Sequence, residues 1–157
     1  MGGRMKAAHA LDLPARTGSQ YPAPHNTPCI ERVRRALGDA FGLSQFGVNL
    51  LDLPPGTWSS QRHWHEQQDE FVYVLEGEVV LVTDEGETVL RPGMIAGFRA
   101  GAGNGHHLVN RSNTTARVLE VGTRTTDEVT CYSDIDMVMR ENAEGWGYFT
   151  KNGRPLK

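Results

Sequence analysis

Histidine is the residue type in this sequence that most clearly suggests chemistry. Four of its six histidines fall in two short clusters, His63 and His65 in QRHWH, and His106 and His107 in NGHHLVN. Alternate residues of a strand point to the same face, so His63 and His65 share a face and Trp64 lies on the other. Two imidazoles on one face are suitable ligands for a transition metal.

A carboxylate follows the first cluster. Glu70 opens the apolar run EFVYVLEG, and the polar segment EQQD between it and His65 predicts a turn. A hairpin would then bring Glu70 beside the two imidazoles. This set suits a divalent metal such as Mn, Fe, Co, Ni or Zn. His106 or His107, about forty residues later, can add a further ligand only if the sheet curls into a barrel.

The elements that must position these residues are short strands. From residue 45 to residue 123 the chain repeats a β-rich run followed by a turn, as in FVYVLEG, EVVLVTD, ETVL, MIAGF, HHLVN and ARVLEVG. No convincing amphipathic helix separates roughly five to seven such runs, so the pattern predicts an all-β sandwich or barrel. Residues 30–37 fit either a short helix or a strand, of which we favour the strand. A further strand is expected over 128–132.

The length of 157 residues predicts one domain. We expect an extended N-terminal arm over residues 1–30, a β-barrel over 31–140, and a C-terminal tail over 141–157 that packs on the barrel or on a dimer partner. The tail carries the aromatic residues Trp146, Tyr148 and Phe149, which suit such a contact.

Composition excludes several classes of protein. A net charge of −3 with both signs interspersed argues against binding to nucleic acid. No apolar run is long enough for a membrane span or a secretory signal. Cys29 and Cys131 lack metal-ligand spacing and indicate free thiols in a reducing compartment. We therefore expect a cytoplasmic protein.

Together these residues resemble the two sequence motifs of the cupin superfamily. The first motif reads here as Gly56, His63, His65, Glu70 and Gly77. The second reads as Gly93, Arg99, Gly101, His106 and Asn110. The first motif has one extra residue after its first glycine. In the second, an arginine replaces the expected proline and two extra residues precede the histidine. More broadly, the whole chain resembles bacterial single-domain cupins.

The resemblance implies a double-stranded β-helix, or jelly-roll barrel, with one divalent metal inside. The implied ligands are His63, His65, Glu70 and His106. Spacing to Asn110 favours His106 over His107 as the last ligand. Cupins also commonly form homodimers, which the resemblance implies for this chain as well.

Strand alternation extends to the lining of the predicted pocket. Gln61, Val72 and Leu108 share the inward faces of the ligand strands. The resulting cavity is expected to be apolar with few polar groups, which suits a small organic ligand. Arg99, at the mouth of the second motif, is a candidate to hold a carboxylate or phosphate. Glu120 faces either inward, as an acid, or outward.

Such a ligand set leaves coordination positions open, which distinguishes a catalytic metal from a structural one. We therefore predict a metal-dependent enzyme that acts on a small organic molecule, of the oxygenase, isomerase or lyase type. The alternative is a non-catalytic small-molecule-binding or sensory module. A third interpretation is a structural β-domain with incidental histidines. The ligand set accepts several metals and does not identify one.

Overall fold

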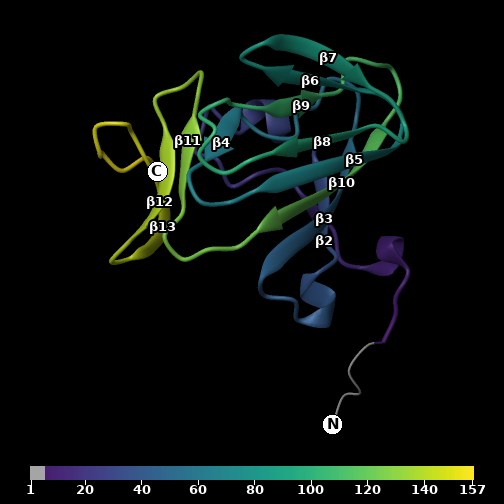
Figure 1. Cartoon of the computed structure of the whole chain (residues 1–157), viewed down its shortest axis with the longest axis horizontal. Coiled ribbons are helices and arrows are strands. Elements are labelled where there is room, and N and C mark those ends of the chain that lie inside the picture. The colour runs from purple at the N-terminus through teal and green to yellow at the C-terminus, as the bar shows by residue number, and fades with distance from the viewer. Residues whose placement is uncertain (1–5) are drawn as a thin grey trace.

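The computed structural model describes residues 6–157. Within this range the chain forms thirteen strands and three short 3₁₀-helices. The helices are η1 (Ala10–Asp12), η2 (Thr27–Cys29) and η3 (Asp39–Phe41). The predicted all-β class is confirmed, and the strands form a jelly-roll arrangement (Figure 1).

The largest sheet has six strands in the order β1-β2-β3-β10-β5-β8, and its neighbours are antiparallel. Its strands are β1 (Arg16–Thr17), β2 (Val33–Ala36), β3 (Phe46–Leu53), β10 (Ala116–Thr123), β5 (Glu70–Glu76) and β8 (Ile95–Phe98). The strand β2 confirms the strand interpretation of residues 30–37. Antiparallel neighbours permit one face to be apolar and the other solvated.

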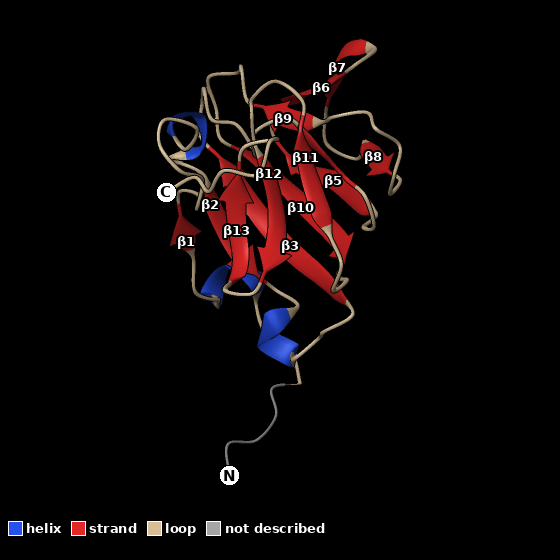
Figure 2. Ribbon diagram, turned by 90° about the vertical axis from the view of Figure 1, so that its left-hand side faces the viewer, coloured by secondary structure: helices blue, strands red, loops and turns tan. Residues whose placement is uncertain are grey.

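Two smaller sheets cover the six-stranded sheet. One has the order β13-β12-β11-β4 and the other the order β7-β6-β9. Their strands are β4 (His63–His65), β11 (Val129–Tyr132), β12 (Val138–Asn142), β13 (Gly145–Phe149), β6 (Val79–Thr83), β7 (Gly86–Leu90) and β9 (His107–Val109). Strands β11 to β13 form a separate layer in Figure 1 and lie in front of β3, β5 and β10 in the turned view of Figure 2.

The hydrophobic core lies between these layers. It is formed by alternate residues of the strands, whose buried members include Leu53, Val72, Val74, Leu108 and Val118. Cross-strand register explains their alignment, because Val118 lies opposite Val74 on β5 and partners across a strand pair point to the same face. The inner face of the six-stranded sheet is therefore apolar at its centre.

Two glycines permit close contacts that shape the barrel. A Cβ atom at Gly77 would lie 2.8 Å from the Thr115 carbonyl oxygen, and the residue has a φ of +72°. A Cβ atom at Gly105 would lie within 3.0 Å of Ser133. A side chain at Gly105, in the turn that leads into the second histidine cluster, would require Ser133 to move.

Segments near both ends of the described range join sheets. Arg16 and Thr17 pair with β2, so part of the expected N-terminal arm belongs to the six-stranded sheet. The expected boundary at residue 140 falls inside β12, and β13 within the expected tail pairs with β12. Cys29 and Cys131 are both free. Across residues 6–157, no helix has the length and apolar character needed to cross a membrane.

Candidate metal centre and its cavity

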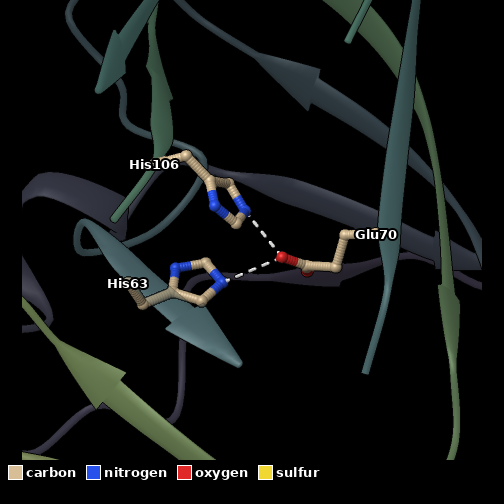
Figure 3. A group of neighbouring side chains, drawn as sticks. All are labelled: His63, Glu70 and His106. Atoms are coloured by element: carbon tan, nitrogen blue, oxygen red, sulfur yellow. Dashed lines mark ion pairs between the residues drawn. The ribbon is translucent and has the colours of Figure 1, made fainter. Parts of the chain in front are cut away.

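Three strands bring the predicted ligands together. His63 and His65 lie on β4, and Glu70 begins β5. His106 immediately precedes β9 and forms an isolated antiparallel bridge with His63. In Figure 3 the side chains of His63, Glu70 and His106 converge, with the carboxylate of Glu70 facing both imidazoles. We call His63, His65, Glu70 and His106 the ligand cluster.

Distances within the ligand cluster are short. Donor atoms of His63, Glu70 and His106 all lie within 4.8 Å of one another. Glu70 Oε2 is 2.6 Å from His106 Nε2 and 3.4 Å from His63 Nε2. The other carboxylate oxygen, Oε1, is 3.3 Å from His65 Nε2. His63, Glu70 and His106 are thus positioned to hold a metal ion, and His65 adjoins them through Glu70.

The hydrogen bonds of the imidazoles indicate which nitrogen is free to act as a ligand. His63 Nδ1 lies 2.8 Å from the Gln61 carbonyl, and His65 Nδ1 lies 3.1 Å from a carboxylate oxygen of Glu128. The carbonyl and the carboxylate only accept, which favours a hydrogen on each Nδ1, and in this neutral tautomer Nε2 presents a lone pair toward Glu70.

These lone pairs meet another acceptor. Glu70 Oε2 is buried and has no partner with hydrogen-bond geometry among residues 6–157. Acceptor atoms that face one another are stabilised by a cation between them. The residues present therefore fit a divalent metal ion.

The protonation states of Glu70 and His106 also favour the binding of a metal ion. Burial alone would raise the pKa of Glu70, but His63 and His106 beside it hold that pKa well below its ordinary value. Burial lowers the pKa of His106, against the opposing contact with Glu70. At neutral pH an ionised Glu70 and a neutral His106 are the forms that bind metal.

Glu128 is a supporting residue that the sequence analysis missed. Its side chain is buried, contacts His65, and accepts hydrogen bonds from the backbone N–H groups of Glu66 and Gln67, both at 3.0 Å. A carboxylate that fixes the tautomer of a ligand histidine is a common feature of metal sites. The sequence places Glu128 at the start of the strand expected over 128–132, but the pairing of Thr130 with His65 that brings Glu128 to the site is visible only in the structure.

The adjacent histidine has a different role. His107 has other partners than Glu70: its Nδ1 lies 2.9 Å from the Ser60 carbonyl, and its ring packs edge-on against Trp58. Leu108 is buried in the core, and with Val72 it lines a small cavity of about 30 Å³ that reaches Glu70. Of the two adjacent histidines, the structure brings His106 to the cluster.

Gln61 and Arg99 differ in their positions. Gln61 is buried, but its amide donates to the His25 carbonyl at 2.8 Å, and it lines none of the described cavities that reach Glu70. The alternation that placed it inward does not apply, because β4 begins only at His63. Arg99 is exposed and lines a cavity of about 110 Å³ beside His65 and His106.

The expectation of an apolar cavity is wrong for the main cavity beside the ligand cluster. This space has a volume of about 300 Å³, and polar side chains line much of it. Three arginines, Arg16, Arg32 and Arg34, line it together with the inward residue Glu120. The prediction failed because strand alternation in the ligand strands says nothing about β1, β2 and the segment between them, which supply this side of the cavity.

Comparisons with known proteins agree with this geometry. Residues 49–122 match the family described as the cupin domain. A sugar phosphate isomerase of the cupin superfamily from Silicibacter pomeroyi is 51% identical, covers 94% of each chain and has a TM-score of 0.89. The chain belongs to the cupin superfamily.

Two further solved structures are similar. A protein from Acidithiobacillus ferrooxidans, provisionally named a sugar phosphate isomerase, is 30% identical over 81% of each chain, with a TM-score of 0.72. The polyketide cyclase RemF from Streptomyces resistomycificus is 26% identical over 76% of this chain and 79% of its own, with a TM-score of 0.62. Among curated proteins, no sequence matches this chain.

Proposed function

We propose that the protein is a metal-dependent isomerase that acts on a small phosphorylated sugar, with His65 as a fourth metal ligand beside His63, Glu70 and His106. One observation carries the proposal: His63, His65 and Glu70 of the ligand cluster line the same cavity of about 300 Å³ as three arginines. A substrate that has an oxygen-rich end for a metal and an anionic end for arginines suits this space. The identity of 51% with a sugar phosphate isomerase supports the same substrate class.

A divalent transition metal of the Mn, Fe, Co, Ni or Zn group would polarise a substrate carbonyl as a Lewis acid. Interconversion of an aldose and a ketose moves one hydrogen between neighbouring carbons and one proton between their oxygens, so it needs no external oxidant or reductant. The chain must then supply a group that accepts and returns a proton.

Glu120 suits that role. Among the described residues that line the cavity, it is the carboxylate outside the ligand cluster. Its Oε1 accepts from Asn49 Nδ2 at 3.2 Å and lies 3.1 Å from an Arg34 nitrogen. Both contacts involve Oε1, so Oε2 is the atom that takes the proton from one substrate carbon and returns it to the next.

An aromatic wall limits the access of water. Tyr21, Tyr132 and Tyr148 line the same cavity, and the ring of Tyr21 packs edge-to-face on the other two with centroid distances of 5.6 and 5.7 Å. Packed rings restrict the mobility of this wall. They orient a small substrate between the ligand cluster and the arginines.

The test combines metal analysis with a turnover assay. Untagged protein is reconstituted anaerobically with Fe(II) or Mn(II) and assayed in both directions with aldose and ketose phosphates. We expect metal binding and interconversion, and we expect the double variant His63→Ala, His106→Ala to lose both. Its metal affinity should fall by more than about a hundredfold, which is the upper range for loss of an outer-shell partner alone.

The matched control is His9→Ala, because His9 lies in the N-terminal segment and, within residues 6–157, its side chain accepts only from the η1 residue Leu11. This variant should retain metal and activity. Full metal content in the double variant would overturn the centre. Tight binding of sugar phosphates without turnover in any metal form would overturn the isomerase and favour a non-catalytic binding module.

A further inference from the structure

The cavity beside the ligand cluster contains more positive charge than its own carboxylates balance. We call Arg16, Arg32 and Arg34 the arginine cluster. Arg16 lies on β1, Arg32 immediately precedes β2, and Arg34 lies on β2. All three line the cavity. Register puts Arg34 on the inner face of the six-stranded sheet, because it lies opposite the fully buried Leu51 on β3.

Arg32 carries a buried charge with neutral partners. It is 7% exposed. Its Nη1 donates to the Ser59 carbonyl at 2.5 Å, and its Nη2 donates to the Gly18 carbonyl at 3.0 Å. Within residues 6–157 Arg32 forms no ion pair with a carboxylate at the distances that define the other salt bridges. A buried cation without a counter-ion is costly to the fold.

The pairing of Arg16 with Arg34 is a second unfavourable arrangement of charge. They lie directly opposite one another in the pairing of β1 with β2. Like charges directly opposite across two strands are destabilising. Arg34 has one carboxylate contact, with Glu120, and its Nε is buried without a hydrogen-bond partner among the described residues.

A hydroxyl group completes the set of donors. Ser19 lines the same cavity, and its Oγ is buried without a partner among residues 6–157. Arg34 Nε and Ser19 Oγ are therefore two buried donors without a partner, and their residues line the same cavity as Arg16 and Arg32. Buried positive charge and donors without partners destabilise a fold, and proteins tolerate them at functional sites where an anionic ligand pairs with them.

We infer that the arginine cluster and Ser19 form the subsite that binds the phosphoryl group of the substrate. The forked guanidinium group matches the oxygens of a phosphate, and a phosphate monoester accepts several charge-assisted hydrogen bonds. The inference rests on the proposed function and adds the place where the phosphoryl end of the sugar phosphate binds. In this orientation the sugar extends from the arginine cluster toward the ligand cluster.

Calorimetry with inorganic phosphate tests the subsite directly. We expect wild-type protein to bind phosphate, and Arg34→Gln to weaken binding by about ten- to a hundredfold, the value of a hydrogen bond to a charged group. Ser19→Ala should weaken binding by about tenfold, the lower end for a hydrogen bond to a charged group, because the hydroxyl itself brings no charge. Arg32→Lys keeps the positive charge but loses the forked guanidinium group. We expect it to weaken phosphate binding more than Ser19→Ala and less than Arg34→Gln.

Arg35→Gln is the matched control. Arg35 is the next residue on β2 but bonds the Leu13 carbonyl and Asp52, not the cavity. It should bind phosphate as wild type does. Metal content checks folding in every variant, because the ligands lie on other strands. If Arg32→Lys does not fold, Arg34→Gln and Ser19→Ala still decide the question.

A second arm compares a ketose phosphate with the same ketose without phosphate. The phosphorylated ligand should bind more tightly to wild type, and this advantage should disappear in Arg34→Gln. Equal phosphate affinity in Arg34→Gln, Ser19→Ala and Arg35→Gln would overturn the subsite even if turnover is observed. Loss of phosphate binding in the first two variants, with no turnover by wild type, would support the subsite and overturn the isomerase.

Discussion

Two arginines with mostly buried side chains show how differently this fold uses the same charge. Arg62, beside the ligand cluster in sequence, donates to both carboxylate oxygens of Asp134 at 2.8 and 2.9 Å and also pairs with Asp84. Arg32, in the arginine cluster, donates to backbone carbonyls. The hydrogen bonds to Asp134 raise the pKa of Arg62, whereas burial lowers the pKa of Arg32.

The difference separates structural charge from charge available to a ligand. Arg62 also donates to the Gly105 carbonyl at 3.2 Å, so it connects β4 to the turn that carries His106. Its charge is matched within the protein by Asp134 and Asp84. The charge of Arg32 is matched by no ion pair within the described chain, which is the condition for binding an anion.

The largest expected effect comes from Glu120, which lies between the two clusters. Glu120→Gln should reduce turnover by about a hundredfold to ten-thousandfold, the range for loss of a general base. The same change should strengthen phosphate binding by about two- to fivefold, because it removes a negative charge that competes for Arg34. Steady-state kinetics and phosphate calorimetry measure the two effects.

Glu120→Gln is informative because turnover should fall while phosphate binding becomes stronger. Glu76→Gln is its control, since Glu76 is exposed and contacts Arg117 on the outer side of the sheet. Unchanged turnover in Glu120→Gln would exclude Glu120 as the base. Weaker phosphate binding would contradict the charge balance assigned to the arginine cluster.

The next effect concerns the ligand cluster alone. Glu128→Gln should weaken metal affinity by about ten- to a hundredfold, because it removes the carboxylate that fixes the His65 tautomer. Phosphate affinity of the metal-free protein should remain at the wild-type value. Competition with a coloured chelator measures the metal affinity, and the exposed neighbour Glu66→Gln is the control. Equal metal affinity in Glu128→Gln and Glu66→Gln would show that the contact does not support the site.

The same contrast explains what the sequence could predict. The fold class and the convergence of His63, Glu70 and His106 follow from local alternation, turn residues and motif spacing, which are visible in one sequence. The arginine cluster depends on the pairing of the two-residue strand β1 with β2, and so short a segment has no periodicity. Gln61 lies before the start of β4, where strand alternation does not fix the direction of its side chain.

The smallest effect tests whether the charge of Arg62 is structural. Arg62 holds the pKa of Asp134 below its ordinary value. A lowered folded-state pKa adds stability at neutral pH, and this contribution is lost as the pH falls through the folded-state pKa. Asp134 is 58% exposed, so Asp134→Asn should reduce the free energy of unfolding by only about 0.5 kcal/mol at pH 7.

The difference between wild type and Asp134→Asn should begin to shrink near pH 4, about the ordinary pKa of an aspartate, and vanish below the folded-state value. Urea unfolding at a series of pH values measures it, with the exposed Asp127→Asn as control. Because Asp134 does not line the cavity beside the ligand cluster, phosphate affinity should stay constant. Weakened phosphate binding in this variant would mean that the charge of Arg62 also serves the ligand, and the distinction between the two arginines would fail.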